Sequence, residues 1–437
     1  MNSLNIPDSK LPRLIIIGGG FGGLKLLRKL VRHHRFQIIL IDKRNYHTFQ
    51  PLLYQVASAG LDVSAIAYPL RKTVREKTPD AFFRMGEAKY IDTELKTVFL
   101  DIGQIDYDYL VLATGTKTNF FGNKEIERKA MRMKSVPQAV NIRSLVLENL
   151  EEATITKDPK KRQALLNFVI AGGGPTGVEL SGAIAELRKN VVPRDYIDID
   201  PKEIQIQLIE GQDRLLASMS EKASKNAKKA LEKLGVQLHL NTRVESYDGK
   251  NIRTANGKEI EAETFVWSAG VTGAPVLGLK EQVLVEKANR YKVNAHNRVE
   301  GYPNIFAIGD IALMQNEKFP KGHPMVAQPA IQQGKHLAKN LLRLLDGKEL
   351  KPFKYVDKGS LATIGRNKAV ADLKVGHFSG FIAWILWMAV HLWFLVGFKN
   401  RVGTFLSWTY RYINYDRSNR LIVRPFKEHP ERLEDEE

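Results

Sequence analysis

The feature that most constrains this 437-residue chain is a repeated strand, glycine cluster and helix. Short apolar runs at residues 14–17 and 167–171 each lead into a glycine cluster that opens a helical pattern. Runs of this length that are rich in Ile, Val and Leu predict buried parallel strands. Further strands are predicted at residues 37–42 and 204–210. The sequence therefore predicts two βαβ units in an α/β fold.

The first glycine cluster, residues 18–23, fits the pattern G-x-G-x-x-G. Gly18 permits a tight turn, Gly20 admits the backbone close to a diphosphate, and Gly23 lets the helix pack against the strand. Asp42 ends the next strand, where its carboxylate can accept hydrogen bonds from a ribose diol. We expect this unit to bind a dinucleotide, and a plain glycine turn in another α/β protein is the alternative.

The second cluster repeats the pattern with Gly172, Gly174 and Gly177, and Glu210 supplies the acidic strand end. A carboxylate there bonds a ribose 2′-hydroxyl and repels a 2′-phosphate, so NADH is favoured over NADPH. Arg214 lies close enough in sequence to keep NADPH open.

Cysteine is absent from the chain, which excludes disulfide frameworks, thiolate metal sites and redox-active Cys pairs. Ten histidines show no ligand spacing, so no metal is expected. The formal net charge is +18, which calls for an anionic neighbour. The basic residues are dispersed without a zinc-finger or basic-helix array, so an anionic lipid surface is favoured over nucleic acid. The polar N-terminus lacks the apolar segment of a signal peptide, which favours a cytoplasmic body.

Two complete units resemble the two-dinucleotide-binding-domain flavoproteins, in which the first unit binds FAD and the second binds NAD(P)H. Residues 113–115 and 267–270 match the crossover motifs of that superfamily. Residues 308–310 match its late motif, whose Asp reaches the flavin ribityl chain; a loop-capping role is the alternative for Asp310. The resemblance covers residues 11 to about 345.

Three further stretches, 49–57, 173–179 and 327–332, resemble one family, the type II (non-proton-pumping) NADH:quinone oxidoreductases. Without cysteine, disulfide reduction and sulfide oxidation are excluded. The resemblance implies that NADH passes hydride to FAD and that two electrons then reduce membrane quinone to quinol. It also implies two Rossmann-like domains, for FAD at 11–120 and 285–345 and for NADH at 160–280, with a C-terminal membrane-associating helical region at 350–437.

Three residues are predicted to be catalytic. Gln328 and Gln332 are spaced i, i+4 and would share one helix face, where neutral amides can meet a quinone carbonyl. The alternative is a pair of solvated glutamines near a helix start. Glu179 is expected in the first turn of its helix, where a surface role that compensates the helix dipole is the alternative. The resemblance instead places the matching Glu between nicotinamide and flavin and implicates it in proton delivery to quinone.

The resemblance also implies the cofactor contacts. Contacts to FAD are expected from Gly18, Gly20, Phe21, Gly22, Gly23, Asp42, Lys43, Gln50, Ala88, Thr114, Gly115, Asp310, Ala327, Gln328 and Lys399. Contacts to NADH are expected from Gly172, Gly174, Thr176, Gly177, Glu179, Glu210 and Gly270.

An aromatic segment, residues 381–398, carries no formal charge and nearly reaches the length of a membrane span. Its tryptophans Trp384, Trp387 and Trp393 suit a lipid interface. The smaller residues Ala383, Val390 and Gly397 recur every seven positions and would face the protein body.

Apolar residues at helical spacing follow at 402–413, with cations around them at Lys399, Arg401, Arg411, Arg417 and Arg420. This pattern is typical of a helix that lies in an anionic interface. We expect a monotopic anchor on the cytoplasmic face of the cell membrane; a transmembrane helix and an aromatic homodimer interface are the alternatives.

Two other functions stay open from the residues themselves. One is an NAD(P)H-dependent reductase of a ferredoxin- or rubredoxin-like protein, whose acidic surface would suit the positive charge. The other is a non-enzymatic, redox-sensing or DNA-associated flavoprotein. Fast turnover with quinone would separate the favoured function from both.

Overall fold

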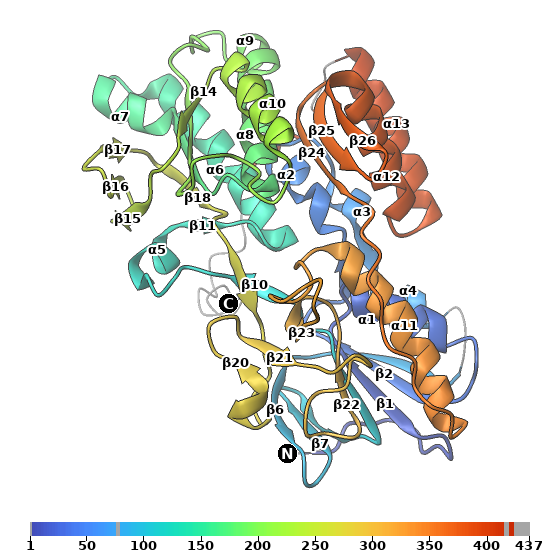
Figure 1. Cartoon of the computed structure of the whole chain (residues 1–437). Helices are drawn as coiled ribbons and strands as arrows, with labels where there is room; N and C mark the ends of the chain where they lie inside the picture. The colour runs from blue at the N-terminus through green and yellow to red at the C-terminus, as the bar shows by residue number, and fades with distance from the viewer. Residues whose placement is uncertain (1, 76–78, 415–418, 424–437) are drawn as a thin grey trace. The chain divides into compact units, whose positions relative to one another are not determined.

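The computed structural model describes residues 2–75, 79–414 and 419–423 of the chain (Figure 1). The chain forms two compact units. Unit 1 comprises Met1–Thr48, Ala67–Lys117 and Val271–Lys358. Unit 2 comprises Phe49–Ile66, Thr118–Gly270 and Gly359–Glu437.

Unit 1 is built on a parallel sheet with the strand order β22-β9-β1-β2-β5. Its central strands are runs of Ile and Leu that are buried on both faces, as expected of a parallel sheet covered on both sides. The bounds are β1 (Arg13–Ile17), β2 (Gln37–Asp42), β5 (Ala81–Met85), β9 (Tyr109–Leu112) and β22 (Ile305–Ala307).

Helices α1 (Phe21–Leu30) and α11 (Ala327–Leu345) pack side by side in unit 1 (Figure 1). Gly334 permits this close approach, because a Cβ there would lie 2.5 Å from the Gly22 carbonyl oxygen. The other elements that lie within unit 1 are β3 (Tyr46–Thr48), β4 (Ala67–Pro69), α4 (Leu70–Arg75), β6 (Ala88–Asp92), β7 (Thr97–Leu100), β8 (Gly103–Asp106), β19 (Val271–Gly273), η2 (Glu281–Val283), β20 (Leu284–Val285), β21 (Arg290–Lys292), η3 (Gly309–Ile311) and β23 (Ala312–Leu313).

Unit 2 contains a second parallel sheet, with the strand order β11-β18-β12-β13-β14. The bounds are β11 (Met131–Arg132), β12 (Asn167–Ala171), β13 (Gln205–Ile209), β14 (Val236–His239) and β18 (Thr264–Trp267). Its helices and smaller strands are α5 (Lys124–Lys129), α6 (Val136–Ile155), α7 (Pro159–Leu165), α8 (Pro175–Asn190), α9 (Val192–Asp195), α10 (Glu221–Lys233), β15 (Val244–Tyr247), β16 (Asn251–Thr254) and β17 (Glu259–Glu261).

The backbone hydrogen bonds and glycine contacts of the two units confirm the repeat predicted from the sequence. Gly18 N donates to Ile41 O at 2.8 Å, and Gly172 N donates to Ile209 O at the same distance. The third glycines repeat the match, because a Cβ on Gly23 or Gly177 would lie 1.9 Å from the carbonyl oxygen of the first glycine of its loop. Each helix can therefore pack this close to its strand only when glycine occupies the third position.

A further layer of unit 2 is assembled from distant parts of the sequence. It contains α2 (Leu53–Ala57), α3 (Val63–Ile66), the antiparallel strands β24 (Ser360–Gly365), β25 (Lys368–Leu373) and β26 (Gly376–Ser379), and the helices α12 (Gly380–Phe394) and α13 (Phe398–Asn414). The two helices follow the strands as the red end of the chain (Figure 1). Gly182 of α8 allows contact with β24, because a Cβ there would lie 2.1 Å from Ile364 O.

The aromatic segment differs from the continuous helix expected over residues 381–398. Helix α12 ends at Phe394, and Gly397 has φ +91°, so the chain turns before α13 begins. Gly397 therefore lies outside the helix whose inner stripe it was expected to extend. No helix among the residues described is long and apolar enough to cross a membrane.

The expectation that three tryptophans lie at a lipid interface is wrong for Trp387. Its side chain is only 2% exposed, whereas Trp393 is 75% exposed. Ala383 is also buried, and it lies one helical turn before Trp387. The inward face of α12 is therefore built on i, i+4 spacing rather than on the seven-residue repeat.

Candidate functional site

The first glycine loop leaves open space in front of the start of α1. Gly20 is the N-cap of this helix and supplies no side-chain cap, and a Cβ at Gly20 would meet nothing within 4 Å. Gly18 has φ +107° and so makes the turn that aims the helix at this space. The backbone N–H groups of the first turn can therefore receive a diphosphate.

Asp42 is fixed beside this loop by two backbone donors. Its Oδ2 accepts from Gly19 N at 2.6 Å, and its Oδ1 accepts from Arg44 N at 2.8 Å. Burial raises the pKa of Asp42, and the two backbone hydrogen bonds oppose that rise. The carboxylate is thus held at the end of β2, where the sequence placed it for a ribose.

His47 in β3 also contacts this loop, although no sequence pattern pointed to it. Its Nδ1 bonds the Gly19 carbonyl oxygen at 2.9 Å, and its ring meets the Phe21 ring edge-on at 5.1 Å. Burial lowers the pKa of His47 to about 4, so the ring is neutral at physiological pH. Neutral His47 holds the loop without adding charge near the diphosphate position.

Other predicted FAD residues of unit 1 gather near the same loop. The Thr114 hydroxyl is buried without a hydrogen-bond partner in the part of the chain that the structure describes, and Gly18 packs directly on the preceding Ala113 carbonyl. Asp310 accepts from the Thr116 hydroxyl at 3.4 Å. An open glycine turn, a fixed carboxylate and an unsatisfied buried hydroxyl fit a bound FAD.

Gln333 is a residue that sequence reasoning missed. It is buried on α11, and its Oε1 accepts from Gly309 N at 2.7 Å, which fixes the turn that carries Asp310. Gln333 lies off the i, i+4 spacing of Gln328 and Gln332, so that pattern carried no signal for it.

The structure gives weaker support to several other residues predicted to contact FAD. Gly22 packs against Ile308, Gly115 has φ +70°, and Ala88 begins β6 half-buried. Lys43 lies 3.8 Å from a Glu87 carboxylate oxygen. Two further residues, Gln50 and Lys399, are exposed and belong to unit 2.

The second glycine loop repeats the first one in unit 2. Glu210 accepts from Gly173 N and from Gln212 N, the latter at 2.7 Å. Asp42 makes the same two bonds, to the second glycine of its loop and to the amide two residues beyond itself. The structure therefore contains two loops with the same carboxylate arrangement, one in each unit.

The remaining NADH residues surround this second loop. Gly174 is the open N-cap of α8, and Thr176 is exposed in the first turn. Gly172 has φ +109°, and a Cβ there would lie 2.7 Å from Ala269. Gly270, which follows Ala269 in the chain, has φ +144°. Arg214 donates to Ala217 O at 2.9 Å.

Glu179 lies deeper than the sequence predicted. Helix α8 begins at Pro175, so Glu179 lies beyond the first turn, and its side chain is only 8% exposed. A surface role that compensates the helix dipole is therefore wrong. Burial raises the pKa of Glu179 to about 8, against the opposing effects of the Thr363 backbone N–H and the Trp387 side chain.

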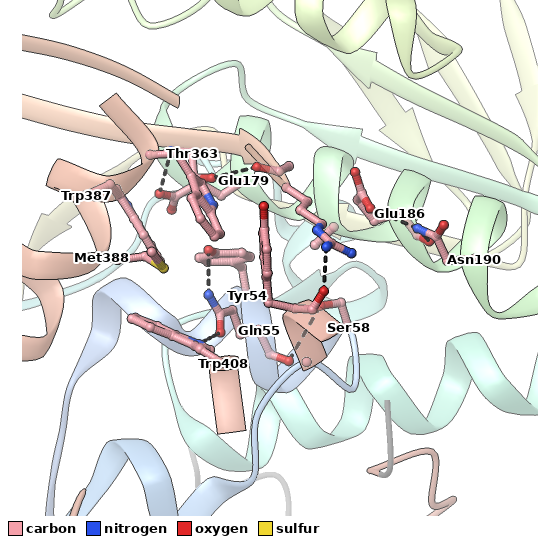
Figure 2. Close-up of a pocket in the computed structure, with 16 residues that line it drawn as sticks. Tyr54, Gln55, Ser58, Glu179, Glu186, Asn190, Thr363, Trp387, Met388 and Trp408 are labelled. Carbon is pink, nitrogen blue, oxygen red and sulfur yellow. Dashed lines mark hydrogen bonds between the residues drawn. The ribbon is translucent and has the colours of Figure 1, made fainter. Parts of the chain in front are cut away.

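Glu179 lines a cavity of about 170 Å³ inside unit 2 (Figure 2). The aromatic wall comes from α12 and α13, with Trp387 and Trp408. Trp408 Nε1 donates to Gln55 Oε1 at 2.9 Å, and Gln55 Nε2 donates to the Tyr54 hydroxyl at 2.9 Å (Figure 2). The cavity therefore combines a protonatable carboxyl with an ordered polar chain and an apolar lining.

Gln328 and Gln332 share a face of α11 in unit 1, as their spacing predicted. Gln332 donates to Val356 O at 2.8 Å and accepts from Val356 N at 3.0 Å. Gln328 accepts from Lys358 N at 3.2 Å. Both side chains are half-buried and engage residues 356–358, so the alternative of two solvated glutamines does not apply.

Comparison with known families accounts for most of the chain. Residues 12–334 match the family described as pyridine nucleotide-disulphide oxidoreductase, and residues 358–414 match the NDH2 C-terminal domain. A type II NADH:quinone oxidoreductase, Ndh, of Mycobacterium tuberculosis is 37% identical over 94% of this chain and 90% of its own length. A type II NADH:quinone oxidoreductase of Haemophilus influenzae is 30% identical over 83% of this chain and 87% of its own.

Solved structures share the fold. NDH2 from Plasmodium falciparum, solved in complex with NADH, superposes with a TM-score of 0.86 at 23% identity and covers 95% of this chain and 100% of that one. The sulfide:quinone oxidoreductase of Aquifex aeolicus gives a TM-score of 0.69 at 20% identity, with 95% and 96% covered. At 23% and 20% identity, both likenesses concern the fold alone.

Proposed function

Because this chain belongs to the type II NADH:quinone oxidoreductases, within the pyridine nucleotide-disulphide oxidoreductase family, we propose that Glu179 exchanges a proton during catalysis and that Gln328 and Gln332 form the quinone site. The enzyme oxidises NADH and reduces quinone to quinol by way of FAD, without pumping protons. The observation that carries the assignment of the sites is the duplicated carboxylate-and-glycine geometry at Asp42 and Glu210.

We assign FAD binding to the loop at 18–23 together with Asp42, Thr114 and Asp310, in the proposed domain 11–120 and 285–345. The N–H groups at the start of α1 hold the diphosphate, and the unsatisfied Thr114 hydroxyl gains a partner. When bound, FAD supplies the redox chemistry by accepting a hydride from NADH and giving two electrons to quinone.

NADH binding falls to the second loop, in the proposed domain 160–280. Glu210 holds the loop at Gly173 and presents its carboxylate to the ribose 2′-hydroxyl, which favours NADH over NADPH. The start of α8 receives the diphosphate, as the start of α1 does for FAD. Glu179 follows on the same helix, and with its pKa near 8 it can exchange a proton close to neutral pH.

Quinone is proposed to meet the face of α11 that carries Gln328 and Gln332. In this structure Gln332 uses both ends of its amide on Val356, so its first contribution is to fix residues 356–358 at that face. Gln328 lies one turn earlier, nearer the helix start, and supplies an uncharged amide to a carbonyl. A neutral donor suits an apolar quinone pocket, because it brings no charge to desolvate.

A lipid surface is proposed as the place where the enzyme meets quinone. Helices α12 and α13 expose large apolar side chains, among them Ile382, Trp393, Phe405 and Leu406. We assign 350–437 to membrane anchoring, of which 415–418 and 424–437 lie outside the described residues. The substrate NADH and the positive net charge favour the cytoplasmic face of the cell membrane. A homodimer through these helices is the alternative use of the same face.

Two of the cations predicted to lie at this membrane surface make contacts within the protein instead. Arg420 pairs with Asp195 at 2.6 Å, and Arg401 donates to Leu395 O at 2.8 Å. Lys399 is exposed at the start of α13. Arg417 and the side chain of Arg411 lie outside what the structure describes.

Steady-state and single-turnover measurements test the proposed roles. The purified protein with FAD should oxidise NADH rapidly only when a short-chain quinone is added. Gln328→Leu should raise the quinone KM about tenfold, equivalent to about 1.4 kcal/mol for one lost hydrogen bond, and leave flavin reduction by NADH unchanged. A wild-type flavin that NADH reduces but quinone cannot reoxidise would overturn the quinone assignment. Equal losses in both half-reactions would remove Gln328 from the quinone site.

A further inference from the structure

Helix α12 has two faces with opposite surroundings. Phe381, Ile382 and Ile385 are exposed on the outer face. The inner face carries Ala383 and Trp387, which are buried, and His391 at the next i, i+4 position. The inner face therefore reaches the interior of unit 2, where Glu179 lies.

The Trp387 ring is held on several sides. It stacks on His391 at 4.1 Å with an interplanar angle of 27°. It also meets Tyr54 at 6.5 Å and Trp408 at 5.5 Å. The indole orientation is thus fixed by α2, α12 and α13 together.

The indole N–H of Trp387 is not satisfied in this arrangement. Trp387 Nε1 is buried and makes no hydrogen bond in the described part of the chain. Trp387 and Glu179 line the same cavity of unit 2 (Figure 2), and the Trp387 side chain lowers the pKa of the carboxyl against the larger effect of burial. A buried N–H beside a carboxyl can form a strong, charge-assisted hydrogen bond once that carboxyl ionises.

Glu179 has few other donors. Thr363 N reaches its Oε1 only at 3.4 Å (Figure 2). One long hydrogen bond cannot replace the water that a buried carboxylate loses, which is why burial dominates its pKa. The ionised form of Glu179 therefore depends on a second donor.

We propose that Trp387 is a positioning residue that stabilises the ionised form of Glu179, so that the outward-facing helix α12 also serves the proton chemistry of the enzyme. This inference rests on the proposed role of Glu179 in quinone reduction. Oxidation of one NADH and reduction of one quinone to quinol consume one proton besides the transferred hydride. Glu179 gives up this proton, and the Trp387 N–H holds the carboxylate until solvent returns one.

The other titratable groups nearby do not supply this effect. They are Glu186 on α8, Tyr54 on α2, Arg366 between β24 and β25, His391 on α12 and Tyr412 on α13. Burial lowers the pKa of His391 to about 4, so this ring is neutral near physiological pH. The pKa of Glu179 follows from its burial, Thr363 and Trp387 rather than from neighbouring charges.

Two substitutions separate hydrogen-bond donation from packing. Trp387→Phe keeps a ring but removes the donor, whereas Trp387→Gln removes the ring and keeps an N–H donor. Trp408→Phe is the matched control, because its N–H serves Gln55 instead of Glu179. The pH dependence of kcat is measured on the full-length FAD enzyme with NADH and a short-chain quinone.

Loss of the donor raises the proton affinity of Glu179, because the hydrogen bond favours the charged form. The limb of the kcat–pH profile that reflects ionisation of Glu179 should move to higher pH by about 0.5–1 unit in Trp387→Phe. It should stay in place in Trp387→Gln and in Trp408→Phe. In a Glu179→Gln background, Trp387→Phe should move nothing. The proposal would be overturned if the pH profile of kcat were unchanged in Trp387→Phe but displaced in Trp387→Gln, because the Trp387 ring would then act through packing and not through its N–H.

An infrared titration of the buried carboxyl gives a readout independent of turnover. The protonated Glu179 band, identified by its loss in Glu179→Gln, should persist to higher pH in Trp387→Phe than in the wild type. If Glu179→Gln leaves the kinetic profile intact, the proposed catalytic role of Glu179 fails. The infrared result still decides whether Trp387 holds the carboxylate, since an unshifted band would refute that contact.

Discussion

Asp42 and Glu210 show how one carboxylate can do two tasks. Each ends a buried parallel strand and accepts hydrogen bonds from two backbone N–H groups of its own unit. The bonds fix the glycine loop in the absence of ligand, and the carboxylate stays at the strand end for a ribose. A substitution at either position therefore changes both loop order and nucleotide recognition.

Glu210 allows these two tasks to be separated. Glu210→Ala should raise the NADH KM about tenfold, equivalent to about 1.4 kcal/mol for a lost hydrogen bond, and relax the selectivity against NADPH. Glu210→Gln keeps an acceptor for Gly173 but removes the charge that repels a 2′-phosphate. It should change the selectivity more than the NADH KM. Steady-state kinetics with both nucleotides check this, and an unchanged NADH to NADPH ratio in both variants would contradict the ribose assignment.

At the scale of elements, α12 and α13 combine burial with exposure. Helix α12 seats Trp387 in the interior, while Trp393 on the same helix is open to solvent. Truncation before residue 380 would therefore remove part of the interior of unit 2 along with the exposed apolar surface. Charge substitutions on the exposed face test membrane binding without opening that interior.

Phe405 and Leu406 are suitable positions, because both are exposed on α13. The double substitution Phe405→Glu and Leu406→Glu should reduce binding to anionic vesicles at least tenfold, since apolar burial is lost and like charge is added. Cosedimentation with phosphatidylglycerol vesicles measures it. Ile155→Glu is the matched control, as Ile155 is an exposed apolar residue at the end of α6. Equal binding by all variants would refute this anchor, and a change only in oligomeric state would indicate a dimer face.

At the scale of the whole molecule, each compact unit contains a histidine that its packing keeps neutral. His47 lies in unit 1 and His391 in unit 2, and burial lowers the pKa of each to about 4. The ordinary histidine pKa of about 6.5 applies in the unfolded chain. Each histidine thus contributes stability that is fully present above pH ~6.5 and is lost as the pH falls toward 4.

Acid should therefore destabilise both units. Between pH 7.5 and 4.5 each histidine should lower the free energy of unfolding by up to about 3 kcal/mol, because its pKa is about 4 in the folded protein and about 6.5 in the unfolded chain. His47→Gln and His391→Gln should each flatten the dependence of the unfolding temperature on pH in the unit that carries the substitution. Calorimetry with hydrogen exchange assigns the transitions to the units. Slopes parallel to the wild type in both variants would show that neither ring is buried in its neutral form.

The sequence by itself determined the two glycine loops and the strands and helices around them. Glycine at the first and third positions is required by backbone geometry, so a local pattern was enough to place Gly18, Gly23, Gly172 and Gly177. Acidic residues at strand ends follow from the same local unit, which placed Asp42 and Glu210 correctly. The i, i+4 spacing likewise put Gln328 and Gln332 on one face.

Only the tertiary structure decided what those faces touch. Gln332 holds Val356, Gln333 holds Gly309, and His47 holds Gly19 through contacts that no local pattern encodes. Glu179 and Trp387 are 208 positions apart in sequence. The local pattern left a surface position open for Glu179 and predicted a lipid-interface position for Trp387, yet both side chains are buried. Packing of α12 against the interior of unit 2 buried both side chains, and burial rather than residue type made the carboxyl of Glu179 protonatable near neutral pH.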